Sequence, residues 1–207
     1  MGQKMKELML IPYPRTGGTF LKMAILQICE FDIISDHCGT DKLYLNKKDT
    51  DSIINNINKK SVITILRNPI NSIQSLIAME YKINNKINKN NVLFTVENRI
   101  KNYFNFFSLI QNNKNNVTIL NFETLINQTE KYINLLAKNN NIKCLNAINI
   151  NEINNGLIIN EKNNSKFYRT SSDEIFYHEL KPIIEKTEII NKAYNLYNNL
   201  LLECLDF

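Results

Sequence analysis

Two short segments hold most of the residues that could bind or transform a ligand in this chain of 207 residues. The first is Pro14-Arg15-Thr16-Gly17-Gly18 and the second is Arg67-Asn68-Pro69. A tight turn from a strand into a helix gathers backbone N–H groups and the positive end of the helix dipole, which together hold a phosphate. In the first segment the glycines let the main chain approach closely, Thr16 and Thr19 add hydroxyl donors, and Arg15 adds positive charge. The first segment therefore predicts a phosphate-binding loop.

The composition makes these two segments stand out further. Asn and Ile are unusually frequent, and only four of the 25 basic residues are Arg. Asn, Ile and Lys share A/T-rich codons, so we expect the gene to come from an A/T-rich genome, such as that of a virus or a low-GC bacterium. Residues with G/C-rich codons should then persist where chemistry needs them. Two of the four Arg, two of the five Gly and three of the four Pro lie within or beside the two segments.

Each segment also has a plainer interpretation. The first lacks the leading Gly and the terminal Lys of the loop G-x-x-x-x-G-K-[ST], which disfavours a nucleoside triphosphatase. It could be an ordinary strand-to-helix turn that uses Gly for steric reasons. Taken alone, Arg67-Asn68-Pro69 could be a turn that caps a helix.

The surrounding pattern predicts three strand–helix units. Short apolar runs at 7–12, 61–66 and 117–122 are each followed by helical spacing, at 19–29, 70–81 and 123–138 respectively. We expect an α/β fold in one domain over residues 1–207, a three-layer sandwich with a central parallel sheet. A buried helix is expected over 94–111, one or two helices over 173–205, an apolar hinge at 31–34, and loops at 41–48, 81–94, 112–116 and 139–165.

The first loop resembles a known family. Tyr13-Pro14-Arg15-Thr16-Gly17-Gly18-Thr19-Phe20 is similar to the Y-P-[KR]-[ST]-G-[TN]-[TS]-[WF] loop of sulfotransferases. That loop holds the 5′-phosphosulfate side of 3′-phosphoadenosine 5′-phosphosulfate (PAPS). The resemblance implies a cofactor-binding role for Arg15, Thr16, Gly17, Gly18, Thr19 and Phe20. Gly18 departs from the more frequent Thr or Asn of the family.

The second segment extends the resemblance. Val62 to Ser75 is similar to the family's strand, its R-[ND]-P turn and its Ser eight residues after the Arg. In the family that Arg and Ser bind the 3′-phosphate, which implies the same role for Arg67 and Ser75. The spacing fits this role, because Ser75 lies about two helical turns beyond the end of the strand.

Weaker similarities follow downstream. Asn121-Phe122-Glu123-Thr124-Leu125 resembles the family's Y-E-D-L, with Phe122 in place of the Tyr whose hydroxyl can reach the nucleotide. We interpret Glu123 as a first-turn acid of its helix. Phe167-Tyr168-Arg169 is similar to the F-x-R-K-G segment that closes over the 3′-phosphate, which implies Arg169 as a phosphate ligand, although the following Gly of that lid is absent. Arg99 matches no motif, and we expect it to be a surface charge.

A general base must take the proton of the sulfuryl acceptor. The resemblance implies His37 for this role, with Asp36 and Asp41 as alternatives, and it places Arg15 beside the oxygen that bridges sulfate and phosphate, where it would stabilise the leaving group. His178 is interpreted as a structural residue of a surface helix.

The resemblance thus implies a PAPS-dependent sulfotransferase that needs no metal, releases 3′,5′-ADP and acts on a hydroxyl or amine of a small-molecule, glycan or peptide acceptor. The alternatives are a catalytically silent nucleotide-binding module of the same fold, or a divergent nucleotide kinase or NTPase.

A net charge of +5 is too small for a nucleic-acid binder. No apolar run reaches the length of a membrane span and no signal peptide is evident, so we expect a cytoplasmic protein with no membrane contact. The four cysteines, Cys29, Cys38, Cys144 and Cys204, show no metal-binding spacing and are expected to be thiols.

Overall fold

The computed structural model describes residues 8–28, 34–35, 47–59, 61–84, 91–139, 149–153, 155 and 171–205. Strands alternate with helices along these residues, which confirms the predicted α/β class. In chain order the elements are β1 (Leu8–Leu10), α1 (Gly18–Ile28), β2 (Ile34–Ser35), α2 (Lys47–Lys59), β3 (Ser61–Leu66), α3 (Pro69–Asn84), α4 (Val92–Asn112), η1 (Lys114–Asn116), β4 (Val117–Asn121), α5 (Phe122–Asn127), α6 (Thr129–Asn139), α8 (Ser171–Glu185) and α9 (Ile190–Leu201).

The described strands form one parallel sheet in the order β2-β1-β3-β4. Strand β1 pairs with β2 through Leu10 and Ser35, and with β3 through Leu10 and Ile63, while β3 pairs with β4 from Val62 to Leu66. The chain runs from β1 outward to β2 and then crosses to β3 on the other side. The order therefore reverses between β1 and β3, and in parallel sheets ligands bind at the carboxyl ends of the strands at such a reversal.

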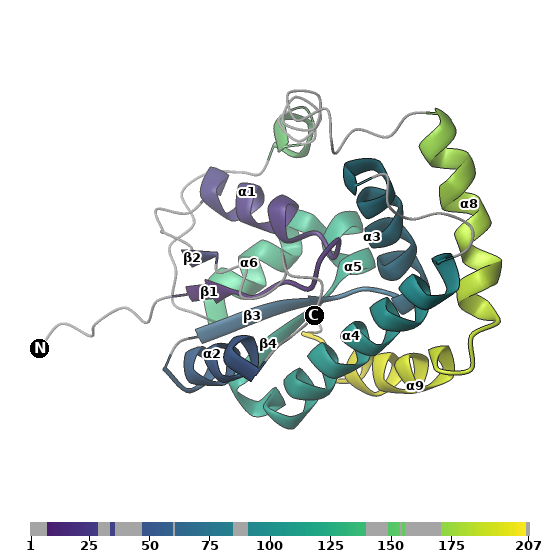
Figure 1. Cartoon of the computed structure of the whole chain (residues 1–207). Helices are drawn as coiled ribbons and strands as arrows, with labels where there is room; N and C mark the ends of the chain where they lie inside the picture. The colour runs from purple at the N-terminus through teal and green to yellow at the C-terminus, as the bar shows by residue number, and fades with distance from the viewer. Residues whose placement is uncertain are drawn as a thin grey trace, which may run out of the picture.

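Helices cover both faces of the sheet (Figure 1). Leu8, Leu10 and Ile63 point to one face, where they pack in one hydrophobic cluster with α1 and α6. Met9, Ile11 and Val62 point to the other face and pack with α2, α3, α4, α8 and α9. Because successive strand residues alternate between two covered faces, β3 is buried from Val62 to Leu66, and Thr64 is the polar residue within that stretch. Helices α1 and α3, which follow the two neighbouring strands β1 and β3, thus lie on opposite faces.

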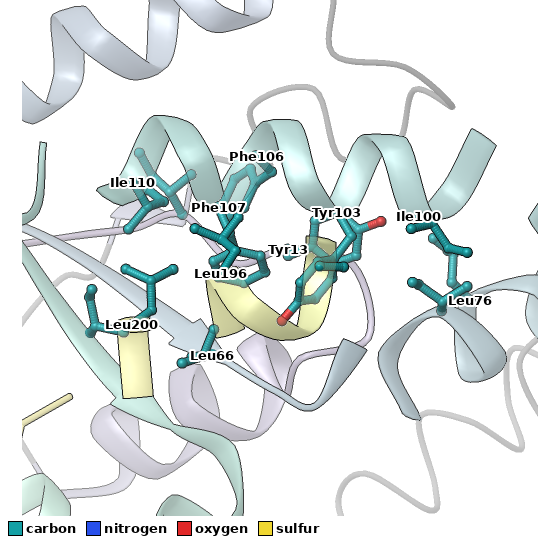
Figure 2. Packing of buried hydrophobic residues seen from close by; sticks show 14 of the residues in the cluster. Tyr13, Leu66, Leu76, Ile100, Tyr103, Phe106, Phe107, Ile110, Leu196 and Leu200 are labelled. Atoms are coloured by element: carbon teal, nitrogen blue, oxygen red, sulfur yellow. The ribbon is translucent and has the colours of Figure 1, made fainter. Parts of the chain in front are cut away.

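The helix expected over 94–111 is confirmed as α4, and it supplies the aromatic part of the core. Figure 2 shows Tyr103, Phe106 and Phe107 on α4 facing Tyr13, with Leu66 below them. The Tyr13 ring lies 5.3 Å from the Tyr103 ring and 5.5 Å from the Phe106 ring, in edge-on and tilted geometries. Full burial of side chains of this size stabilises the fold by about 1.5–3 kcal/mol each. The start of the predicted phosphate loop is therefore anchored in the aromatic part of the core.

Several elements differ from the sequence expectation. Ile34, expected in a hinge, begins β2, and α2 includes Lys47 and Lys48 of the expected loop at 41–48. The helix expected over 123–138 is two helices, α5 and α6, because Gln128 leaves the helical conformation at φ −133° and ψ 43°. Its carbonyl accepts the first hydrogen bond of α6, from Tyr132 N. The segment 173–205 contains the two helices α8 and α9, and no helix in the described part of the chain is long and apolar enough to cross a membrane.

The expectation that Arg99 is a surface charge is wrong. Arg99 is only 5% exposed and forms an ion pair with Glu80, with Arg99 Nη2 2.9 Å from Glu80 Oε2 and Arg99 Nε donating to the same oxygen. Helix α4 packs along α3, and this pairing buries both charged groups together. A buried Arg needs such a partner, because an unpaired buried charge is strongly unfavourable.

Candidate functional site

The predicted phosphate loop leaves the carboxyl end of β1 as a tight turn. Thr16 N and Thr16 Oγ1 both donate to the carbonyl of Tyr13, at 3.3 and 2.6 Å, so the Thr16 side chain closes the turn. Two residues inside the turn have a left-handed backbone, Arg15 at φ 62° and Gly17 at φ 90°. Gly17 adopts this conformation without a steric penalty, whereas Arg15 adopts it at a cost of about 1–3 kcal/mol. The surrounding contacts must hold Arg15 in place.

Both glycines of the loop are required sterically. A Cβ on Gly17 would lie 2.8 Å from Phe122 Cε2, and a Cβ on Gly18 would lie 2.6 Å from Pro12 Cγ. Phe122 begins α5 after β4, which lies on the far side of β3 from β1, and its ring packs against the loop. Helix α1 then starts, with Leu21 N donating to Gly17 O at 3.0 Å as its first helical bond. Its first turn contains no acidic residue, so no carboxylate of that turn competes for an anion there.

The second segment is indeed a helix-capping turn. Asn68 Oδ1 accepts hydrogen bonds from Ile70 N and Asn71 N, at 3.0 and 3.4 Å, and Pro69 is the first residue of α3. Asn68 and Pro69 therefore have a structural function that the local sequence explains. Arg67 has no part in this cap, and its side chain extends instead toward the first loop.

Arg67 joins the two loops. Its Nη1 donates to the carbonyl of Arg15 at 2.7 Å, and its guanidinium carbon lies 4.3 Å from the centre of the Phe122 ring. Its own carbonyl accepts a hydrogen bond from Tyr103 Oη at 2.7 Å. One arginine thus links β3, the β1–α1 turn and the start of α5.

A second connection runs in the opposite direction, from the first loop to α3. Arg15 Nε donates to Ser75 Oγ at 3.2 Å, and Ser72 Oγ donates to the carbonyl of Pro14 at 3.3 Å. Ser72 and Ser75 are both buried, on the side of α3 that faces the loop. The structure therefore brings together three residues that the sequence predicts for one site, Arg15, Arg67 and Ser75.

Other predicted site residues have different surroundings. Thr19 is exposed on α1, whereas Phe20 is 7% exposed and packs in the hydrophobic cluster beneath that helix. Glu123 is an exposed acid in the first turn of α5, as interpreted from the sequence. His178 is exposed on α8 with its ring against Tyr177, as also expected.

The predicted base and the predicted lid residue lie outside the described residues. These are His37, its alternatives Asp36 and Asp41, and Arg169. In sequence, the described residue nearest to His37 is Ser35, which ends β2 and pairs with Leu10 of β1. Of the cysteines, Cys204 is described, and its buried thiol donates to the carbonyl of Leu200 at 3.5 Å.

Sequence reasoning missed Phe122, Pro12 and Tyr103 as residues that shape the site. Phe122 lacks the hydroxyl that would reach a nucleotide, but its position directly after a parallel strand places it at the carboxyl edge of the sheet, where ligands bind. Pro12 and Tyr103 are buried residues that contact the two loops, at Gly18 and at the Arg67 carbonyl, and neither belongs to a binding motif. Their contacts link residues far apart in the chain, which a local pattern does not record.

The buried tyrosines beside the loop are unsuited to act as bases. Burial raises the pKa of Tyr13 far above its ordinary value of 10.0, and the nearby Arg99 offsets this only in part. Burial also raises the pKa of Tyr103. Tyr13 Oη donates to the carbonyl of Arg99 at 3.3 Å, so its proton is held in a structural hydrogen bond. Neither tyrosine is therefore a candidate proton acceptor beside this loop.

The two loops thus bring two guanidinium groups, a serine hydroxyl and the start of α1 together at the reversal of strand order, and these are groups that can bind an anion. Within the described residues, no group of three or more His, Cys, Asp or Glu side chains could hold a metal ion. Comparison of the chain with protein families, curated proteins and solved structures finds no match.

Proposed function

We propose that this protein is a PAPS-dependent sulfotransferase with a P-loop-like sulfotransferase fold. The observation that carries the proposal is the contact between the two loops, Arg67 Nη1 to Arg15 O at 2.7 Å. A nucleotide with a 5′-phosphosulfate and a 3′-phosphate needs two anion subsites within one ligand length. The turns after β1 and β3 supply positive groups at adjacent strand ends, which fits such a ligand.

The proposed chemistry depends on positioning and on charge. The first turn of α1 directs backbone N–H groups at the 5′-phosphosulfate, and Arg15 and Arg67 add positive charge as the bisphosphate leaves. By resemblance, Arg67 and Ser75 bind the 3′-phosphate, Arg15 lies beside the bridging oxygen, Arg169 binds a phosphate, and His37 accepts the proton of the acceptor hydroxyl or amine. The products are the sulfated acceptor and 3′,5′-ADP.

A catalytically silent nucleotide-binding module is the second candidate. The observation that favours it is Phe122, whose ring packs against Gly17 and the Arg67 guanidinium. Phe122 also lacks the hydroxyl of the Tyr that the sulfotransferase motif has at this position. Such a module would bind 3′,5′-ADP without transferring a sulfuryl group. A divergent kinase or NTPase would instead require ADP with Mg²⁺ to bind as well as 3′,5′-ADP does.

Turnover separates these functions. The full chain is incubated with PAPS and a panel of phenol, alcohol, amine, glycan and tyrosine-peptide acceptors, and formation of 3′,5′-ADP and of sulfated product is measured. We expect transfer to at least one acceptor class. His37→Ala should lose at least 100-fold in rate, within the range of about 10²–10⁴ for general-base catalysis. It should still bind 3′,5′-ADP.

His178→Ala is the matched control, because His178 is the other histidine of the chain and is exposed on α8. It should retain the full rate. If binding of 3′,5′-ADP is present but no acceptor is sulfated, the silent module is the correct function. If His37→Ala retains the rate, the base is another group, and Asp36→Asn and Asp41→Asn are the next variants.

A further inference from the structure

Strand β4, at one end of the described strand order, is hydrogen-bonded to a residue that follows α9. Leu205 N donates to the carbonyl of Ile119 at 2.8 Å. The Leu205 carbonyl accepts a hydrogen bond from Tyr132 Oη at 2.8 Å, and the same hydroxyl accepts one from Asn121 N at 3.3 Å. Leu205 is therefore connected to the residues on both sides of Leu120, directly on one side and through a hydroxyl on the other.

This hydrogen-bond pattern is that of a parallel strand pair. In such a pair one residue donates its N–H to the residue before its partner, and its carbonyl accepts from the residue after that partner. Leu205 has this relation to Leu120, except that the Tyr132 hydroxyl is inserted into the second hydrogen bond. The inserted hydroxyl thereby holds the backbone of Asn121, the last residue of β4.

The chain passes round the edge of β4 at this point. Cys204 is buried in the hydrophobic cluster that contains α4 and α9, whereas Leu205 packs against the cluster that contains α1 and α6, on the other face of the sheet. Tyr132 belongs to α6 and is only 1% exposed. Packing therefore holds the ring of Tyr132, so that its hydroxyl keeps one position between Asn121 and Leu205.

The residue after Asn121 is Phe122, which contacts both loops of the candidate site. The guanidinium carbon of Arg67 lies 4.3 Å from the centre of its ring, and a Cβ on Gly17 would lie 2.8 Å from its Cε2. Asn121 also caps α5, since its Oδ1 accepts a hydrogen bond from Thr124 N at 3.0 Å. A shift at the end of β4 would therefore carry the Phe122 ring and the start of α5 with it.

We propose that Tyr132, together with Leu205, is a positioning residue of the nucleotide site. Its hydroxyl holds the end of β4 and so sets the place of the Phe122 ring against Arg67 and Gly17. This inference rests on the proposed function, because the effect of the positioning is measured as nucleotide binding. Tyr132 and Leu205 lie outside every segment that carries the resemblance to sulfotransferases.

The test is a double-variant cycle measured by titration calorimetry with 3′,5′-ADP on the full chain. Tyr132→Phe removes the hydroxyl and keeps the ring, and it should weaken binding about 2- to 10-fold, the equivalent of one neutral hydrogen bond. Phe122→Leu should weaken binding about 2- to 30-fold, because the contact between the ring and the Arg67 guanidinium is lost. Since Tyr132 acts through Phe122, adding Tyr132→Phe to Phe122→Leu should weaken binding by less than about twofold more.

Ile133→Val is the matched control. Ile133 is the next residue of α6, is equally buried and has no hydrogen-bonding side chain, so its loss of packing should leave the affinity for 3′,5′-ADP unchanged. If Tyr132→Phe is unstable, Leu205→Pro replaces it, because it removes the N–H that donates to Ile119. Leu205→Pro should then weaken binding in the same way, whereas Leu205→Ala, which keeps the N–H, should not.

Amide exchange measured by NMR without nucleotide is a second readout. Thr16 N and Leu21 N are both hydrogen-bonded within the first loop and the start of α1. Tyr132→Phe should speed the exchange of these two amides more than that of the amides of α8, because the loosened Phe122 ring no longer supports the loop. A general loss of stability would speed all of these amides alike.

Unchanged affinity in Tyr132→Phe, an equal loss with and without Phe122→Leu, or the same loss in Ile133→Val would overturn this inference, while the nucleotide site would stand. If the unsubstituted chain does not bind 3′,5′-ADP, the proposed function is overturned. The exchange of Thr16 and Leu21 then decides the inference alone, since selective acceleration supports it and unchanged exchange overturns it. A loss of affinity that depends on Phe122 supports both the inference and the proposed site.

Discussion

Gly18 shows at the residue scale why this loop differs from the sulfotransferase loop that it resembles. That loop more often has Thr or Asn at this position, but a Cβ here would lie 2.6 Å from Pro12 Cγ and 2.8 Å from Pro12 Cβ. The proline ring is rigid and belongs to the buried end of the β1 segment, so it has little room to yield. The ring of Pro12 therefore occupies the space that a side chain at position 18 would need.

Gly18→Ala should lower the free energy of unfolding by about 1–3 kcal/mol, the usual cost of overpacking. The sign of this change in the free energy of unfolding separates overpacking from helix propensity. Gly18 begins a helix, where replacement of Gly by Ala normally stabilises by about 1 kcal/mol. Urea denaturation measures the change. Thr19→Ala is the control, since Thr19 is exposed next to Gly18, and it should stay within about 0.5 kcal/mol. A Gly18→Ala variant that gains stability would show that Pro12 yields to the new methyl group.

At the element scale, α3 connects the site to the core. Its first turn is capped by Asn68, its middle presents Ser72 and Ser75 to the first loop, and its end carries Glu80, which pairs with Arg99 of α4. Tyr13 Oη donates to the carbonyl of Arg99, so the residue that starts the first loop also rests on this pair. The Glu80–Arg99 ion pair therefore helps to hold Tyr13, at the start of the first loop, in position.

Glu80→Ala should destabilise the protein by about 3–5 kcal/mol, because it leaves Arg99 buried without its carboxylate partner. Replacing both residues by Leu should cost clearly less than Glu80→Ala alone, since no charge then remains in the core. Chemical denaturation of the single and double variants measures this. A double variant that is less stable than Glu80→Ala would indicate that the pair itself, and not its broken half, supplies the stability. The exposed pair Lys181 and Glu185 on α8 is the control, where Glu185→Ala should cost less than about 1 kcal/mol.

The pH dependence of this pair has a defined sign. Burial raises the pKa of Glu80 above its ordinary value of 4.5, and Arg99 offsets the rise only in part. The folded protein thus binds the Glu80 proton more tightly than the unfolded chain does, so this contribution to stability is present below pH 4.5 and is lost as pH rises through the raised pKa. We expect the difference in unfolding free energy between the unsubstituted chain and the Glu80→Gln variant to fall as the pH rises from 4.5 through the raised pKa of Glu80. A difference that grows with pH would mean that the attraction of Arg99 outweighs burial.

The sequence predicted the three strand–helix units because each has a compact apolar run followed by helical spacing, and in the first two a turn with Gly or Pro separates strand from helix. It missed β2, which has two residues, and α2, whose Asn- and Lys-rich sequence has few apolar residues, Ile53 and Ile57 being its buried ones. It also misplaced Arg99, because burial of a charge depends on a partner 19 residues away on another helix. Within the site, local motifs predicted Arg15, Arg67 and Ser75. Contacts between distant segments, such as Phe122 with Gly17, have no local signal.

At the scale of the whole molecule, the strand order explains why two loops separated by about fifty residues act together. Strand β1 lies between β2 and β3, and the helices that follow β1 and β3 cover opposite faces of the sheet. The turns after β1 and β3 therefore start at adjacent strand ends. The Arg15 side chain reaches from the first turn to α3, and the Arg67 side chain reaches from the second turn to the first. A ligand held there touches both halves of the fold and should stabilise the molecule as a whole.

The most direct test of this account is a thermal-shift measurement on the full chain with 3′,5′-ADP and, separately, with ADP and Mg²⁺. At 100 times its Kd, 3′,5′-ADP should add about 2.7 kcal/mol of stability, a rise in Tm of roughly 5–10 °C for a chain of this size. Arg67→Ala should lose most of that shift, and Lys181→Ala, an exposed change on α8, should keep it. A rise in Tm with ADP and Mg²⁺ that equals or exceeds the rise with 3′,5′-ADP, or an undiminished shift in Arg67→Ala, would contradict the claim that the two loops bind one 3′-phosphorylated nucleotide.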